Sequence, residues 1–102
     1  MRIITRRRLN EYAKLHPNAA ASLSTWYDVV RKSAWKNLQE LRQSFPNADP
    51  ATVTSGKTVI IFNIAGNHHR LITAIHYDTG KIFILEILTH AEYSKSRWKK
   101  LL

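Results

Sequence analysis

The sequence predicts an α+β domain in which helices cover one face of a twisted antiparallel sheet. Apolar residues in the first half recur at spacings of three and four, which is typical of helices. Those in the second half form three strand-length runs separated by turns rich in glycine and asparagine. The chain has 102 residues, so we expect one domain over residues 1–102 with a single modest core.

The first half is predicted to hold a short strand and a helical hairpin. Residues 1–5 resemble a strand, and Thr5 can cap a helix that runs to about His16. Pro17 ends that helix because proline lacks the amide hydrogen, and Asn18 can cap the next helix. The inner faces of the two helices are expected to comprise Leu9, Tyr12 and Ala13, and then Leu23, Trp26, Tyr27, Val30 and Ala34.

A shorter helix is expected over residues 37–45, because Pro46 cannot continue it. Residues 47–56 are expected to form a loop. Three strands follow, over residues 57–64, 68–77 and 81–88. The turns between these strands are short, so the strands should pair antiparallel in sequence order. A short C-terminal helix is predicted to follow the last strand.

Alternation along the second of these strands assigns its side chains to two faces. The set that contains His69 and Leu71 is the more apolar in its middle, so we expect it to meet the helices. His68, Arg70 and His76 would then lie on an open face of the sheet, unless a bulge of one residue inverts the alternation.

The C-terminal helix begins with a recognisable motif. The sequence Thr-His-Ala-Glu at residues 89–92 forms a capping box, and Leu88 with Tyr93 can form a hydrophobic staple. These structural roles leave His90 unexplained. In the first helical turn His90 would lie near the positive end of the helix dipole, which favours the neutral imidazole that a general base needs. The alternative is a surface histidine without a function.

The charge of the chain points to a polyanionic partner. Sixteen lysines and arginines against seven acidic residues give a net charge of +9. Such an excess favours RNA, DNA, a ribosome surface or an acidic protein, although charge also aids solubility. Lys95, Arg97 and Lys99 surround Trp98, and basic residues interleaved with an aromatic can follow a phosphate backbone and stack a base. They can equally complement the C-terminal end of a helix dipole.

Several classes of protein are disfavoured. The chain has no cysteine, which excludes disulfides and thiolate zinc sites and fits a cytoplasmic location. No apolar run approaches the roughly 20 residues that span a bilayer. Adjacent histidines on a strand point to opposite faces, and no carboxylate lies at a zinc-like spacing from them. The sequence therefore predicts no metal and no other cofactor.

Three segments together resemble a known family. They are FNIAGNHHRLITAIHY, ILTHAEYSKSRW and the stretch from Arg7 to Asp49, which contains HP between the first two helices, STWY and FPNAD. In order and spacing they resemble the HigB toxins of bacterial toxin–antitoxin systems, within the RelE-like superfamily. The resemblance implies a RelE-like fold and an endoribonuclease that cuts mRNA without a metal, usually on the translating ribosome. It also implies neutralisation by a helix-turn-helix antitoxin of the HigA type, with operator DNA bound through the complex of the two.

Two positions depart from the family pattern. The family often has tyrosine where this chain has His69, which adds a titratable group beside the expected site. It often has aspartate where this chain has Ser94, so a carboxylate is lost there.

Metal-free RNA cleavage would use the 2′-hydroxyl as the nucleophile. The enzyme must remove its proton, stabilise a phosphorane and protonate the leaving 5′-oxygen. We expect Arg70 to hold the phosphorane, His90 to act as base or acid, Tyr93 to orient or share that role, and Lys57 to make a secondary phosphate contact. The residues expected to hold RNA are His68, Lys95, Arg97, Trp98 and Lys99.

Two other functions remain open at this point. A basic module could grip RNA or a ribosome without cutting it. A DNA-binding repressor acting alone is less favoured, because no recognition-helix pattern is present.

Overall fold

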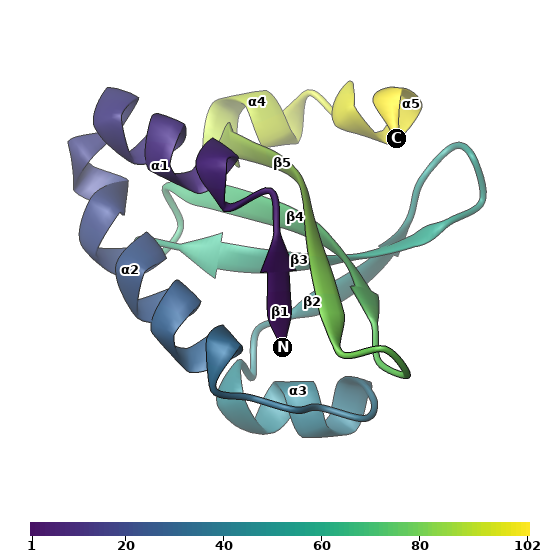
Figure 1. The fold of residues 1–102 in the computed structure, drawn as a ribbon. Helices are drawn as coiled ribbons and strands as arrows, with labels where there is room; N and C mark the ends of the chain where they lie inside the picture. The colour runs from purple at the N-terminus through teal and green to yellow at the C-terminus, as the bar shows by residue number, and fades with distance from the viewer.

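A five-stranded mixed sheet runs through the centre of the computed structural model, which describes residues 1–102 (Figure 1). The strands are β1 (Arg2–Ile4), β2 (Asp49–Thr52), β3 (Thr58–Ile64), β4 (His69–His76) and β5 (Lys81–Thr89), in the spatial order β1-β5-β4-β3-β2. The pairs β2–β3, β3–β4 and β4–β5 are antiparallel, whereas β1 pairs parallel with β5. The predicted α+β class is therefore confirmed, with one parallel pair at the β1 edge.

Five helices surround this sheet. They are α1 (Arg6–Leu15), α2 (Pro17–Arg31), α3 (Leu38–Ser44), α4 (His90–Ser94) and α5 (Trp98–Leu101). In Figure 1, α1 and α2 form the hairpin on one side of the sheet, α3 lies at the lower end, and α4 and α5 lie across the upper end. No helix combines the length and the apolar composition that a membrane crossing requires.

Apolar side chains form one cluster on each face of the sheet. The larger one packs the helical hairpin against the sheet and includes Leu23, Trp26, Phe62 and Leu71. The smaller one, on the opposite face, comprises Val53, Val59, Ile61, Ile72 and Trp98. The face that was predicted to be open is therefore partly covered by Trp98 of α5, and only the remaining part is available to a ligand.

The helical hairpin differs in detail from its prediction. Thr5 occupies the N-cap position of α1, but its side chain accepts no capping hydrogen bond. The expectation that Asn18 caps α2 is wrong, because α2 already begins at Pro17 and has His16 at its N-cap. Proline suits the first helical position, where no amide partner is needed. α2 ends at Arg31, so Ala34 lies outside the helix and is exposed.

The prediction of a loop over residues 47–56 is wrong for Asp49–Thr52, which form β2. Aspartate and proline disfavour strands, but β2 is the edge strand, where Pro50 does not have to donate to a neighbour on its outer side. Its pairing with β3 supplies the order that the local sequence lacks.

A bulge in β5 decides which of its side chains face the core. Ile72 of β4 pairs with Glu86 and the next residue, Thr73, pairs with Ile84, so Leu85 is the extra residue. The bulge lies on β5, and therefore the alternation predicted for β4 is preserved. Arg8 of α1 holds the bulge, because its guanidinium donates to the backbone oxygen of Leu85 and lies 2.9 Å from the Glu86 carboxylate.

Candidate active site

Arg70 lies on the sheet face opposite α1 and α2, as the alternation predicts, and is 8% exposed. Its Nη1 donates to the backbone oxygens of Asn67 and His69, each at 3.1 Å, and its Nη2 donates to Oδ1 of Asn67 at 2.6 Å. These bonds use three of the five N–H donors of the guanidinium, and the other two have no protein partner. Arg70 is therefore a fixed cation with spare donors, which suits it to a phosphate group.

Tyr93 links Arg70 to the second core cluster. The guanidinium carbon of Arg70 lies 5.3 Å from the centre of the Tyr93 ring, within cation–π range. The Tyr93 and Trp98 rings stack with their centres 5.3 Å apart and their planes at 13°. Nε1 of Trp98 also donates to the backbone oxygen of Tyr93 at 3.1 Å. The position of Tyr93 thus depends on Trp98 as well as on its own helix.

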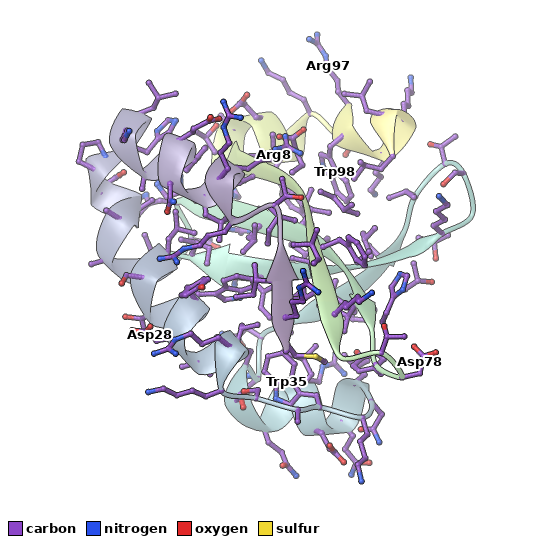
Figure 2. All side chains as sticks on the ribbon, in the orientation of Figure 1. Arg8, Asp28, Trp35, Asp78, Arg97 and Trp98 are labelled. Carbon is purple, nitrogen blue, oxygen red and sulfur yellow. The ribbon has the colours of Figure 1, made fainter.

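Trp98 itself is 3% exposed and lies beneath α5 in Figure 2, which disagrees with the expectation that it stacks a base. Its place at a helix with basic neighbours suggested an exposed aromatic. Instead, the indole packs into the smaller apolar cluster on this face of the sheet.

His90 and His68 lie side by side where β5 ends and β4 begins. His90 is the first residue of α4, and its backbone N–H donates to the backbone oxygen of His68 at 2.9 Å. Both residues are exposed. The capping box that starts α4 is confirmed: Oγ1 of Thr89 accepts from the Glu92 amide, and the Glu92 carboxylate accepts from the Thr89 amide. Because α4 starts at this box, it carries His90 and Tyr93 to the edge where Arg70 stands.

Lys57 does not join this group. Arg70 pairs with Asn63 across β3 and β4, and Lys57 precedes β3 six residues before Asn63. At about 3.3 Å per residue the two sites are roughly 20 Å apart along the strand. The hairpin that contains Lys57 instead approaches α5, since the amide of Thr54 donates to the backbone oxygen of Lys99 at 3.0 Å.

The other basic residues lie along the C-terminal turn. Lys95, Arg97 and Lys99 are exposed, and Arg97 points away from the molecule in Figure 2. We call these three residues, together with Lys57 on the hairpin bonded to α5, the basic C-terminal surface. The structure therefore places Tyr93 against Arg70 and the bonded pair His68 and His90 at the same end of β4, whereas the other predicted cations are exposed.

A groove of about 390 Å³ opens beside Arg70. Its lining comes from β2, β3 and β4, from α3 and the segment after it, and from α4. It is lined by Arg42, Pro46, Asn47, Ala48, Asp49, Ile61, Asn63, Arg70 and Tyr93. A cavity of this size is within the range that holds small ligands. The groove thus supplies room for part of a nucleotide next to the spare donors of Arg70.

The opposite side of β4 carries a polar cluster around the buried His69. Nδ1 of His69 lies 2.6 Å from the Tyr12 hydroxyl, and Nε2 lies 3.2 Å from Oδ1 of Asn18. Burial lowers the pKa of His69, and the nearby His16 and His68 lower it further. Burial, with the negative charge of Glu92, raises the pKa of Tyr12 to about 12. Both groups therefore remain neutral at pH 7, and they tie α1 and α2 to the strand that bears Arg70.

Sequence reasoning missed several residues of the site. Asn67 was interpreted only as part of a turn, although it provides two of the three oxygens that hold Arg70. Its spacing of three residues from an arginine was the available signal. Asp49 and Asn47 were placed in a loop, and the contribution of that segment to the groove depends on β2. No three histidine, aspartate or glutamate side chains lie close enough to share a metal ion.

Comparison with known proteins gives a consistent picture. The family model HigB_toxin, described as a RelE-like toxic component of a toxin–antitoxin system, matches residues 19–96. The chain belongs to the HigB toxin family. The mRNA interferase HigB of Escherichia coli O6:H1 (strain CFT073) is 32% identical over 95 residues, which cover 93% of this chain and 90% of that protein.

Two further relatives agree with this family. The mRNA interferase toxin HigB of Escherichia coli K12 and the mRNA interferase HigB of Shigella flexneri are each 28% identical over 93 residues, which cover 91% of this chain and 88% of theirs. The predicted HigB family is therefore confirmed. As the toxic component of a toxin–antitoxin system, this HigB-family chain has an antitoxin partner.

Proposed function

We propose that this HigB-family chain is an endoribonuclease that cleaves mRNA, with Arg70, Tyr93 and His90 at its active centre. The observation that carries the proposal is the state of Arg70. Its guanidinium is nearly buried, oriented by three protein oxygens, and still has two free donors beside an open groove. A cation held in this way needs no reorganisation when negative charge develops next to it, which is the basis of electrostatic catalysis. The names of the relatives, all mRNA interferases, support the choice of substrate.

The reaction is transfer of the phosphodiester to the neighbouring 2′-hydroxyl. The 2′-oxygen loses its proton and bonds to phosphorus, and the bond from phosphorus to the 5′-oxygen breaks. The leaving 5′-oxygen takes up a proton. The products are a 2′,3′-cyclic phosphate and a 5′-hydroxyl end. Arg70 stabilises the phosphorane, and the exposed imidazole of His90 transfers protons at the 2′- or 5′-oxygen. Tyr93 orients the phosphate or shares this role. No cofactor takes part in this scheme.

The basic residues hold the RNA rather than react with it. His68 lies next to His90. In this proposal it contacts the RNA close to the cleaved bond. The basic C-terminal surface of Lys57, Lys95, Arg97 and Lys99 binds phosphates of mRNA or of ribosomal RNA farther away. We propose Lys57 for this outer role in place of a catalytic one, because it lies at the far end of β3 from Asn63 and Arg70. Trp98 acts through Tyr93, as its support.

The setting of the reaction follows from the same charges. A chain of net charge +9 is attracted to the ribosome, and we propose that cleavage takes place there during translation, in the cytoplasm. The antitoxin is a helix-turn-helix protein of the HigA type, and operator DNA is bound only through its complex with this toxin. Residues 1–102 act as one domain in this proposal.

The test is the chemistry of the cut. A reporter mRNA is translated in a cell-free reaction with the purified chain, and the 5′ ends produced are mapped. The reporter is then made again with a single 2′-deoxynucleotide on the 5′ side of one mapped cut. We expect the normal cut to leave a 5′-hydroxyl, and the deoxy substitution to abolish that cut alone. Persistent cleavage at the substituted site would refute the 2′-hydroxyl mechanism, and arrested translation with intact reporter would favour a module that binds without cutting.

A further inference from the structure

The groove beside Arg70 has a polar lining that phosphate binding does not explain. We propose that it binds the nucleobase adjoining the scissile phosphate, and that Asp49 and Asn63 select a base with an exocyclic amino group over uracil. This inference rests on the proposed nuclease function, and it makes the groove a specificity-determining subsite of the same centre.

Strand pairing places the selecting groups at nucleotide distance from Arg70. Asn63 of β3 is the register partner of Arg70 of β4, and side chains opposite each other across strands lie about 5 Å apart. Asp49 of β2 pairs with Ile61, two residues before Asn63, so its side chain stands on the same face two strands from Arg70. With strands about 4.8 Å apart and about 3.3 Å per residue along a strand, two strands and two residues give a reach of roughly 12 Å. A nucleotide spans a similar length from its phosphate to the far edge of its base.

The charge of Asp49 argues for a base rather than a second phosphate. Asp49 is one of only seven acidic residues in a chain of net charge +9. None of the three ion pairs of the structure includes it, and its carboxylate makes no hydrogen bond within the protein. A free carboxylate in the groove repels phosphate, but it accepts hydrogen bonds from amino groups. Adenine, cytosine and guanine each present such a group, whereas uracil has carbonyl oxygens at those positions and only its ring N3–H as a donor.

The rest of the groove fits a base held by its edge and its face. The side-chain amides of Asn63 and Asn47 have no protein partners and offer both donors and acceptors. Ile61 contributes an apolar floor. One wall is fixed, because Nε of Arg42 donates to the backbone oxygen of Ala48 at 3.1 Å. Proteins read single-stranded RNA in this manner, with the base splayed out and hydrogen-bonded along its edge.

The first test is the base composition around mapped cuts. The chain is induced briefly in bacteria, the new mRNA 5′ ends are sequenced, and Asp49→Asn and Asn63→Ala are compared with the unchanged protein. Asp78→Asn is the matched control, since Asp78 is an exposed carboxylate in the turn between β4 and β5 (Figure 2), at the opposite end of β4 from Arg70. We expect uracil to be depleted about tenfold at one position flanking the cut, as one hydrogen bond to a charged group predicts. The depletion should vanish in Asp49→Asn, weaken in Asn63→Ala and persist in Asp78→Asn.

The second test measures binding without cleavage. Purified protein is titrated with pentanucleotides of 2′-O-methyl cytidine, adenosine or uridine, which cannot be cut. We expect the uridine oligomer to bind several-fold more weakly, and Asp49→Asn to remove the difference. Selective binding without any mRNA cleavage would overturn the nuclease function and leave the base-binding groove standing. Cleavage with identical base composition in all variants, together with equal binding of the three oligomers, would overturn the groove proposal and leave the nuclease standing.

Discussion

The hydroxyl oxygen of Tyr12 lies 2.6 Å from Nδ1 of His69, and this contact joins α1 to β4 directly behind Arg70. With Asn18 on the other ring nitrogen, a neutral His69 satisfies both neighbours: it accepts from the tyrosine and donates to the amide oxygen. The helical hairpin is thereby fixed to the strand that carries Arg70.

The stability of the fold should decline in mild acid because of His69. Its pKa is lowered in the folded chain, so the unfolded chain binds the proton first as the pH falls. The contribution of His69 to the free energy of unfolding is therefore fully present above the pKa of an unfolded histidine, about 6.5. It is lost as the pH falls through the lower pKa that His69 has in the folded chain. We expect the free energy of unfolding, measured with urea from pH 8 to pH 5, to decrease below about pH 6.5.

The control for this effect is His69→Gln, which replaces the imidazole with an amide that does not titrate. The free energy of unfolding of this variant should depend less on pH over the same range. His16 and His68 lie near His69 and help to lower its pKa, so the decisive quantity is the difference between the two proteins. A decline of equal steepness in the variant would mean that His69 is not its cause.

Asn67→Ala should slow cleavage because it removes the side-chain oxygen that orients Arg70. We expect kcat to fall about tenfold, as the loss of one charge-assisted hydrogen bond predicts, and KM to change little. Asn10→Ala, on an exposed part of α1, is the matched control. Single-turnover cleavage of a reporter mRNA measures the effect, and a rise in KM at constant kcat would instead place Asn67 in substrate binding.

Trp98→Ala should destabilise the fold by about 3 kcal/mol, because it empties a buried site and removes the ring on which Tyr93 stacks. Trp98→Phe should recover most of the loss. Thermal unfolding of both variants measures it. If Trp98→Ala melted at an unchanged temperature but bound RNA more weakly, the prediction that Trp98 stacks a base would be favoured instead.

Lys57→Ala should weaken RNA binding without slowing the bound reaction. Lys57 is exposed and its hairpin approaches α5, which is why we propose it as an outer phosphate contact. Removing one phosphate contact should lower the slope of log affinity against log salt by about 1. Fluorescence titrations with a single-stranded RNA at several salt concentrations give this slope. Loss of RNA cleavage by Lys57→Ala at saturating protein concentration would instead indicate a catalytic role for Lys57.

The sequence was most informative where a local rule determines the structure. Alternation placed His69 and Arg70 on opposite faces of β4, and the capping box at residues 89–92 is present as predicted. Periodicity found the three central strands and the helical hairpin. The order and spacing of motifs identified the family.

Non-local contacts account for what the sequence did not reveal. β2 exists because β3 pairs with it, although Asp49 and Pro50 disfavour a strand locally. Trp98 is buried because α5 folds back over the sheet. A helix of four residues is too short for its hydrophobic pattern to predict this packing. Asn67 and the groove residues acquire their roles only when three strands and two loops meet around Arg70.

The central claim is that Arg70 is the cation of an RNA-cleaving site, and one measurement tests it most directly. The unchanged chain, Arg70→Ala and the control Arg31→Ala are each induced briefly in bacteria, and mRNA 5′ ends are mapped. We predict new ends within translated frames for the unchanged chain and for Arg31→Ala. For a folded Arg70→Ala variant, these ends should fall by about 10²–10³. New ends at equal frequency in Arg70→Ala would contradict the account, because the reaction would then proceed without the residue on which it rests.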